Sequence, residues 1–201
     1  MHDPRSFARL DESPDERFYQ PVRLVEHIDS GAIGVVTELY REHFSANADL
    51  LDLMSSWVSH LPDDVAYRSV VGLGMNAQEL QSNARLTRRV VQNLNVQTQL
   101  PFEDATFDAA LICVSIQYLT QPVTVFRELA RVTRPGAKLI VTFSNRCFPT
   151  KATSIWTTTS DREHLRIVAD YIRAAGGWDE AATATCLGRG DPLFSVIASR
   201  T

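Results

Sequence analysis

Three parts of this 201-residue sequence gather polar, aromatic and reactive side chains that could form a binding or catalytic site. One is the N-terminal region, and the other two follow apolar runs of strand length that end at Ser115 and Ser144. Loops at strand ends often carry function, because a rigid sheet positions their side chains. The candidates are Phe18, Tyr19, Arg23, His27 and Asp29 in the first part, Ser115, Gln117 and Tyr118 in the second, and Asn145, Arg146, Cys147, Phe148 and Lys151 in the third.

These residue types suggest two kinds of role. A proton acceptor or a reactive group would come from His27, Tyr118 or Cys147. The wall of a substrate site would be formed by Tyr19, Trp57, Gln117, Asn145 and Arg146.

Several of these residues also have a plainer structural interpretation. His27 is as readily a packed or surface histidine as a base. Cys147 could be a small packed residue, since free cysteine is often buried and inert. Arg146 and Lys151 either form a solvated face or bind an anionic acceptor. Residues expected only to pack are Cys113 and Cys186, within apolar strands, and Trp156 and Trp178.

The composition narrows the class of protein. A hydrophobic content of 44% and a charged content of 22% are typical of a soluble globular domain. The net charge of −4 argues against a nucleic-acid partner, which would select a basic face. Three cysteines without a Cys-x-x-Cys pair favour reduced thiols in the cytoplasm. We find no signal peptide, no run that could span a membrane, and no metal-ligand spacing among the five histidines.

Alternating helical and strand patterns predict one α/β domain. Residues 1–20 are expected to be loosely ordered, and residues 21–201 to form the domain, with a helical lid at 21–45. The predicted helices span 21–27, 31–43, a segment that begins at Asn76, 122–133 and 161–175. Arg134-Pro135-Gly136 ends the fourth of them. The predicted strands span 50–54, 69–75, 89–95, 107–115, 138–144, 182–187 and 193–199, and a turn at 188–192 joins the last two as a hairpin.

Three strings of residues resemble a known family in type, order and spacing. They are Leu50-Leu51-Asp52-Leu53, Leu-Pro-Phe-Glu-Asp-Ala-Thr-Phe-Asp at 100–108, and Glu-Leu-Ala-Arg-Val-Thr-Arg-Pro-Gly at 128–136. They resemble class I S-adenosylmethionine-dependent methyltransferases of the type-11, ubiquinone-biosynthesis-like branch, over residues 50–144. The resemblance implies a Rossmann-like, seven-stranded, mostly parallel sheet with helices on both faces and an antiparallel last strand. Its ligand would lie across the carboxyl ends of the first strands.

The resemblance also implies S-adenosyl-L-methionine as cofactor, with altered contacts. The usual motif I glycines are replaced by Met54, Ser56 and Val58, which resembles a subgroup with a non-glycine motif I. Ser55 and Ser56 are expected at a helix N-terminus, where they either face the cofactor's carboxylate or only cap the helix. The residues that this family pattern assigns to the cofactor are Asp52, Met54, Ser55, Ser56, Gly74, Met75, Asn93, Leu94 and Val114.

Two further positions depart from the family pattern. Gly74 stands where an acid usually accepts the ribose hydroxyls, and Asn76 could accept one of them or cap the next helix. Asn93 replaces an acid beside the adenine, but its side-chain oxygen can still accept that hydrogen bond.

The leading interpretation is an S-adenosylmethionine-dependent methyltransferase that acts on a small-molecule acceptor. The lost glycines and the missing acid support an alternative, a non-catalytic or regulatory domain with a degenerate cofactor pocket. A dinucleotide-dependent oxidoreductase has little support without a Gly-x-Gly-x-x-Gly string.

Overall fold

Seven strands form one mixed sheet in the order β3-β2-β1-β4-β5-β7-β6. β1 to β5 pair in parallel, and β7 runs antiparallel to both β5 and β6. This arrangement confirms the predicted Rossmann-like sheet and its antiparallel last strand. The strands are β1 (Asp49–Leu53), β2 (Ser69–Gly74), β3 (Arg88–Val91), β4 (Phe107–Cys113), β5 (Thr133–Phe143), β6 (Ala182–Cys186) and β7 (Leu193–Ser199).

The computed structural model describes residues 4–187 and 190–201. The expected turn at 188–192 therefore lies partly outside the described residues. No helix among the described residues is long and apolar enough to cross a membrane.

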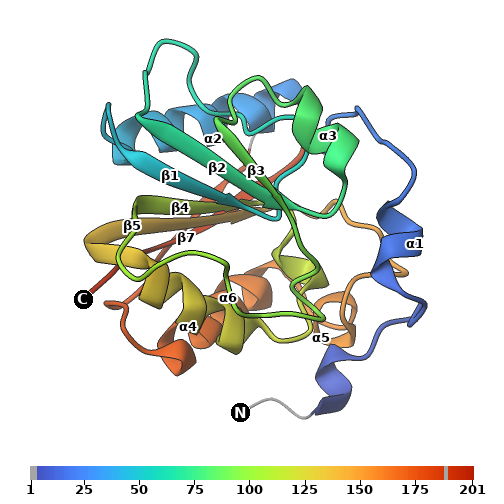
Figure 1. The fold of residues 1–201 in the computed structure, drawn as a ribbon. Coiled ribbons are helices and arrows are strands. Elements are labelled where there is room, and N and C mark those ends of the chain that lie inside the picture. The colour runs from blue at the N-terminus through green and yellow to red at the C-terminus, as the bar shows by residue number, and fades with distance from the viewer. Residues whose placement is uncertain (1–3, 188–189) are drawn as a thin grey trace.

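Helices cover both faces of the sheet (Figure 1). On one face lie α2 (Ser30–His43) and the short α3 (Ala77–Ser82), and on the other lie α4 (Pro122–Val132) and α6 (Asp161–Ala175). α2 buries Ala32, Val36 and Tyr40 in one apolar cluster with the sheet. The central strands are almost wholly buried, because helices on both sides exclude water from them.

Side chains at the helix ends set where several helices begin and stop. The Asn76 side chain accepts hydrogen bonds from the backbone N–H groups of Gln78 and Glu79, so α3 begins directly after β2, as predicted. Ser160 and Glu163 form a capping box at the start of α6. α6 ends at Gly176, whose φ of 74° suits glycine.

Two helices expected from the sequence are missing from the described residues. Residues 21–27 are extended, because tertiary contacts hold their backbone: the Arg23 N–H donates to the Glu79 carboxylate, and the Val25 carbonyl accepts from the Trp57 indole. Residues 54–68, between β1 and β2, also contain no helix. Ser55 and Ser56 therefore do not stand at a helix N-terminus, and that expectation was wrong.

The segment around β5 also differs from its prediction. β5 begins at Thr133 rather than at 138, and its Arg134-Pro135-Gly136 stretch lies where the register against β4 shifts. Within the expected loop at 145–156, a short helix α5 (Ser154–Thr157) begins.

At the edge of the sheet, β6 is exposed along its whole length, so Cys186 is an exposed residue and not a core residue. Trp156 and Trp178 are buried, as expected of packing residues.

The N-terminal residues run past the carboxyl ends of the strands (Figure 1). They include the 3-10 helix η1 (Pro4–Phe7) and the helix α1 (Asp15–Tyr19), and we call residues 9–27 the N-terminal strap. The strap is anchored by Lys151, which is fully buried. Its Nζ lies 3.2 Å from an Asp11 carboxylate oxygen and 3.3 Å from one of Asp15, and donates to the Ser13 carbonyl at 2.6 Å.

These contacts correct one expectation. Lys151 is neither part of a solvated face nor free to bind an anionic acceptor. Within the first 20 residues, α1 forms a helix and Asp15 makes a buried ionic contact. A loosely ordered segment 1–20, the division of the chain at residue 20, and a lid role for residues 21–45 stay predictions.

Candidate functional site

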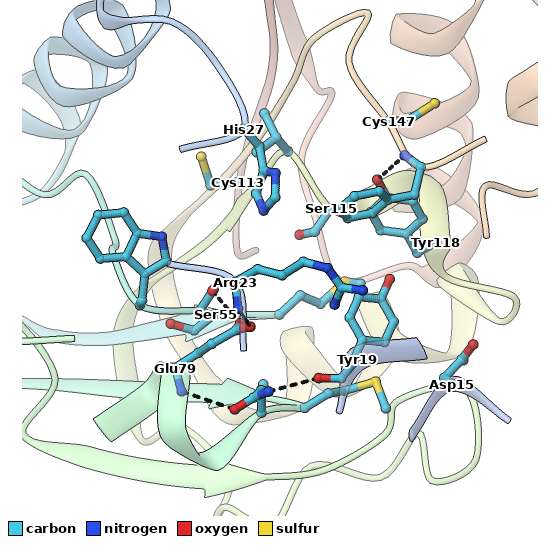
Figure 2. Close-up of a pocket in the computed structure, with 18 of the residues that line it drawn as sticks. Asp15, Tyr19, Arg23, His27, Ser55, Glu79, Cys113, Ser115, Tyr118 and Cys147 are labelled. Carbon is cyan, nitrogen blue, oxygen red and sulfur yellow. Dashed lines mark hydrogen bonds between the residues drawn. The ribbon is translucent and has the colours of Figure 1, made fainter. Parts of the chain in front are cut away.

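A cavity of about 660 Å³ lies at the carboxyl ends of β1, β2 and β4, beneath the N-terminal strap. This is the edge of the sheet where open α/β folds hold ligands. Its volume lies within the usual range for small-molecule sites. Figure 2 shows side chains of the strap, including Tyr19, Arg23 and His27, facing Ser55, Ser115 and Tyr118 across this space.

The cavity brings together most of the residues singled out from the sequence. All nine positions assigned to the cofactor line it, from Asp52 at the end of β1 to Val114 after β4. The three catalytic candidates His27, Tyr118 and Cys147 also line it, as do Tyr19, Trp57, Asn145 and Arg146. Gln117 does not. It is buried in the 3-10 helix η2 (Ile116–Tyr118), and its amide donates to the Val114 carbonyl.

Asp52 lies at the floor of the cavity and fixes the loop that follows β1. One of its carboxylate oxygens accepts hydrogen bonds from the Ser55 and Ser59 hydroxyls, both at 2.6 Å. The Asn83 amide donates to the Ser59 hydroxyl at 2.9 Å and closes the network. Burial raises the pKa of Asp52 to about 6, although the two serine hydrogen bonds act in the opposite direction.

The loop after β1 passes very close to the end of β2. The Ser55 N–H donates to the Leu73 carbonyl, and a Cβ placed on Gly74 would lie 2.1 Å from the Ser55 carbonyl oxygen. Any side chain at position 74 would therefore collide with the loop backbone. The loop after β1 thus fills the space at Gly74, the position where the family resemblance expects an acid.

The backbone keeps a left-handed conformation at two cavity positions. Met54, at the first of the usual glycine positions, has a φ of 60°, and Val114 has a φ of 42°. Such conformations cost about 1–3 kcal/mol for a residue that is not glycine, and they gather at functional sites. Met54 therefore follows the backbone path that a glycine would allow, without being one.

Both asparagines proposed for the cofactor already have protein partners. The Asn76 oxygen caps α3, and its amide donates to the carbonyls of Tyr19 and Gln20. The Asn93 amide donates to the Glu16 carboxylate at 2.8 Å, and its oxygen accepts from the Asn95 N–H. Asn76 is thus a cap that joins α3 to the strap, and not a free acceptor for a ribose hydroxyl.

Rings and imidazoles form the opposite wall of the cavity. The Tyr118 ring stacks on Phe148 with centroids 5.9 Å apart, and the His27 ring meets Phe148 edge-on at 5.4 Å. Desolvation by burial lowers the pKa of both His27 and His60, so both imidazoles are neutral near pH 7 and able to accept a proton. Burial raises the pKa of Cys147, which favours the thiol over a nucleophilic thiolate.

Among the cavity residues that sequence reasoning missed are His60, Glu79 and Cys113. Cys113 was expected in the core, but it is only partly buried and lines the cavity. Burial raises its pKa to about 11. Glu79 was noted only for its spacing from Asn76. A signal for its role existed, because the third residue of a helix that follows a strand's carboxyl end points back toward that end.

The donors and acceptors of the cavity fit the cofactor that the resemblance implies. The Ser115 hydroxyl is buried, lines the cavity and bonds to no group among the described residues, so it is free to contact a ligand. The second Asp52 oxygen and the Glu79 carboxylate can accept from ammonium or hydroxyl groups. Leu94 and Met75 offer apolar surface for a heterocycle.

Comparison with known proteins finds similarity over the part of the chain that forms much of the cavity. A family model described as a methyltransferase domain matches residues 54–141. A demethylmenaquinone methyltransferase of Mycolicibacterium paratuberculosis is 41% identical over 99 residues, which make up 49% of this chain and 41% of that protein. The aligned part thus spans less than half the length of this curated relative.

Solved structures share the fold over most of the chain. The [4+2]-cyclase SpnF has a TM-score of 0.66 at 16% identity, with 90% of this chain and 89% of that chain covered. Phosphoethanolamine N-methyltransferase 2 of Haemonchus contortus, in complex with S-adenosyl-L-methionine, has a TM-score of 0.60 at 13% identity. That match covers 83% of this chain and 51% of the other. At these identities the likeness shows the fold alone.

Proposed function

We propose that this chain, which carries a class I methyltransferase domain, binds S-adenosyl-L-methionine in the cavity and transfers its methyl group to a small-molecule acceptor. The observation that carries the proposal is the convergence of all nine predicted cofactor positions on one cavity at the carboxyl ends of β1, β2 and β4. The family match over residues 54–141 supports it. The domain would belong to a subgroup with a non-glycine motif I.

The cofactor supplies a methyl group on a positively charged sulfur, which an electron-rich acceptor atom can displace. Catalysis of such a displacement rests mainly on alignment and on exclusion of water. The strap and the ring wall of Tyr118 and Phe148 line the cavity and would shield a bound ligand from water. His27 or His60, neutral near pH 7, would accept a proton from an acceptor that must lose one.

Several observations bear on the acceptor and on where the protein works. The cavity is a concave site with the volume of a small-molecule pocket, which favours a metabolite over a nucleic acid or a membrane surface as the partner. Cys113, Cys147 and Cys186 are all free thiols, which fits a reducing compartment such as the cytoplasm.

Thermal unfolding with S-adenosylhomocysteine tests the proposal. A ligand at one hundred times its dissociation constant adds about 2.7 kcal/mol to the free energy of unfolding. For a domain of this size we expect a rise in melting temperature of roughly 5–10 °C. The rise should shrink in Asp52→Ala, because that change removes the carboxylate at the cavity floor and the anchor of the loop after β1.

A second candidate function is a regulatory domain without catalysis. The filling of the Gly74 position by the Ser55 carbonyl oxygen favours it, because the usual ribose acid has no room there. No thermal shift with S-adenosylmethionine or S-adenosylhomocysteine at millimolar concentration would support this candidate and refute the methyltransferase. A shift with NAD instead would point to a dinucleotide enzyme.

A further inference from the structure

We propose that Glu79 of α3 is the carboxylate that binds the ribose hydroxyls of the cofactor, in place of the acid that position 74 cannot carry. This inference rests on the function proposed above and assigns one subsite within it. It names a residue on a different element from the end of β2, where the family resemblance places that acid.

The starting point is the filled space at Gly74. The Ser55 carbonyl oxygen occupies the position that a side chain would need, and the Ser55 N–H is bonded to Leu73. The ribose of a ligand at this edge of the sheet would still need a hydrogen-bond acceptor near the end of β2. That acceptor must therefore reach the cavity from another element.

Four carboxylates line the cavity, and the other three differ from Glu79 in how they are held or placed. Asp15 is buried with Arg9 at 2.6 Å and Lys151 at 3.3 Å. Asp52 lies at the floor, where it holds Ser55 and Ser59. Glu26 is exposed on the strap, and its charge acts on His60. Glu79 is the remaining carboxylate.

Glu79 has both the position and the spare capacity for this role. It is the third residue of α3, the helix that begins directly after β2, and it is only partly buried. Its Oε1 accepts a hydrogen bond from the backbone N–H of Arg23 at 2.8 Å, and its Oε2 accepts one from the Ser56 hydroxyl at 2.7 Å. An ionised carboxylate has about four acceptor positions, so two remain for the two ribose hydroxyls. Figure 2 shows the side chain directed toward Arg23 within the drawn site.

The two partners of Glu79 also hold it in place. Ser56 belongs to the loop after β1, and Arg23 belongs to the N-terminal strap. The carboxylate is therefore fixed from both sides before a ligand arrives, which lowers the entropy lost on binding. Asn76 strengthens this arrangement because it caps α3 and bonds to the strap through Tyr19 and Gln20.

Calorimetric titration of the full chain with nucleosides that differ only in their hydroxyls tests the assignment. The probes are S-adenosylhomocysteine, 5′-methylthioadenosine, and the 2′-deoxy and 3′-deoxy forms of methylthioadenosine. A hydrogen bond to a charged group is lost with each hydroxyl, so the deoxy forms should bind the wild type roughly tenfold to a hundredfold more weakly. In Glu79→Gln this penalty should fall to about twofold, while Glu79→Asp should lie in between.

Glu26→Gln is the matched control, because it removes a carboxylate of the same cavity that does not contact Ser56 or Arg23. It should keep the full deoxy penalty. A melting temperature close to that of the wild type will show that Glu79→Gln is folded, and Glu79→Asp provides a second reading if it is not.

The remaining outcomes contradict the assignment in distinguishable ways. An unchanged deoxy penalty in Glu79→Gln would overturn it. Weaker binding of S-adenosylhomocysteine with unchanged binding of methylthioadenosine would place Glu79 at the amino-acid end of the ligand instead. Failure of the wild type to bind any of these adenosine derivatives would overturn the proposed function itself, and the subsite with it.

Discussion

At the scale of single residues, Asp52 lies in the proposed cofactor site and carries a stability penalty. Its carboxyl is buried, and burial raises its pKa from 3.8 to about 6. Between these pH values the folded chain holds more of this proton than the unfolded chain, so this group makes stability fall as pH rises through the window. Above about pH 6, the full cost of burying the ionised Asp52 carboxylate lowers the free energy of unfolding. A shift of this size corresponds to about 3 kcal/mol.

Asp52→Asn tests this linkage. The amide cannot ionise but can still accept from Ser55 and Ser59, so we expect a free energy of unfolding about 1–3 kcal/mol higher than wild type at pH 8. The difference should vanish near pH 4. Urea denaturation at several pH values measures it, with Asp63→Asn as an exposed control. A difference that does not change with pH would contradict the buried-carboxylate account.

Gly74 is the second residue whose role follows from a single contact. Gly74→Ala brings a Cβ against the Ser55 carbonyl oxygen, which is backbone and cannot rotate away. We expect a loss of about 1–3 kcal/mol in the free energy of unfolding, as for other overpacked sites, and weaker binding of S-adenosylhomocysteine.

Gly34→Ala is the matched control for this substitution. Gly34 lies on the exposed side of α2, with nothing within 4 Å of its added Cβ. The alanine should stabilise the chain by about 0.5–1 kcal/mol, because glycine is unfavourable inside a helix. Equal effects of the two substitutions in denaturation experiments would refute the close approach at Gly74.

At the scale of elements, the N-terminal strap depends on its anchor at Lys151. Lys151→Ala leaves the buried Asp15 with Arg9 as its remaining ionic partner and removes the donor to Ser13. We expect the free energy of unfolding to fall by about 3 kcal/mol, as when a buried ion pair is broken. Limited trypsin digestion should cut faster at Arg17 and Arg23, because the strap opens more often.

The chain's only other lysine supplies the control. Lys138 lies in β5 and bonds to the Ser199 hydroxyl at the end of β7, so Lys138→Ala should leave strap cleavage unchanged. Unaltered cleavage in Lys151→Ala would show that the strap is held by other contacts.

At the scale of the whole molecule, the order of the strands predicts where the fold opens. β1, β4 and β5 each have strands on both sides, whereas β3 and β6 are edge strands. Hydrogen exchange should therefore be slowest in the central strands and fast in β6, which is exposed throughout.

S-adenosylhomocysteine should change this exchange pattern locally. We expect slower exchange at residues 15–27, 54–60 and 92–95, segments that contribute residues to the cavity, and no change in α4 or β6. Mass spectrometry of exchanged peptides measures this. Protection spread evenly over the chain, or absent from the strap, would contradict binding beneath the strap.

The sequence alone predicted the features that depend on local patterns. Apolar runs located the buried strands, the Asn76 cap located α3, and the helical pattern over 161–175 located α6. The family resemblance located the nine positions that gather at the cavity. Such features follow from a residue and its near neighbours, which the sequence displays directly.

Tertiary structure decided what depends on contacts between distant segments. Residues 21–27 have a helical pattern but are extended, because Glu79 and Trp57 take their backbone groups. Lys151 reads as a surface cation, and only the return of the N-terminal strap buries it. The sequence also does not show that the Ser55 carbonyl fills the space at Gly74, or that Glu79 bonds to Ser56 of the same loop. Each of these outcomes is set by the close approach of segments far apart in the chain, and local residue patterns do not encode that approach.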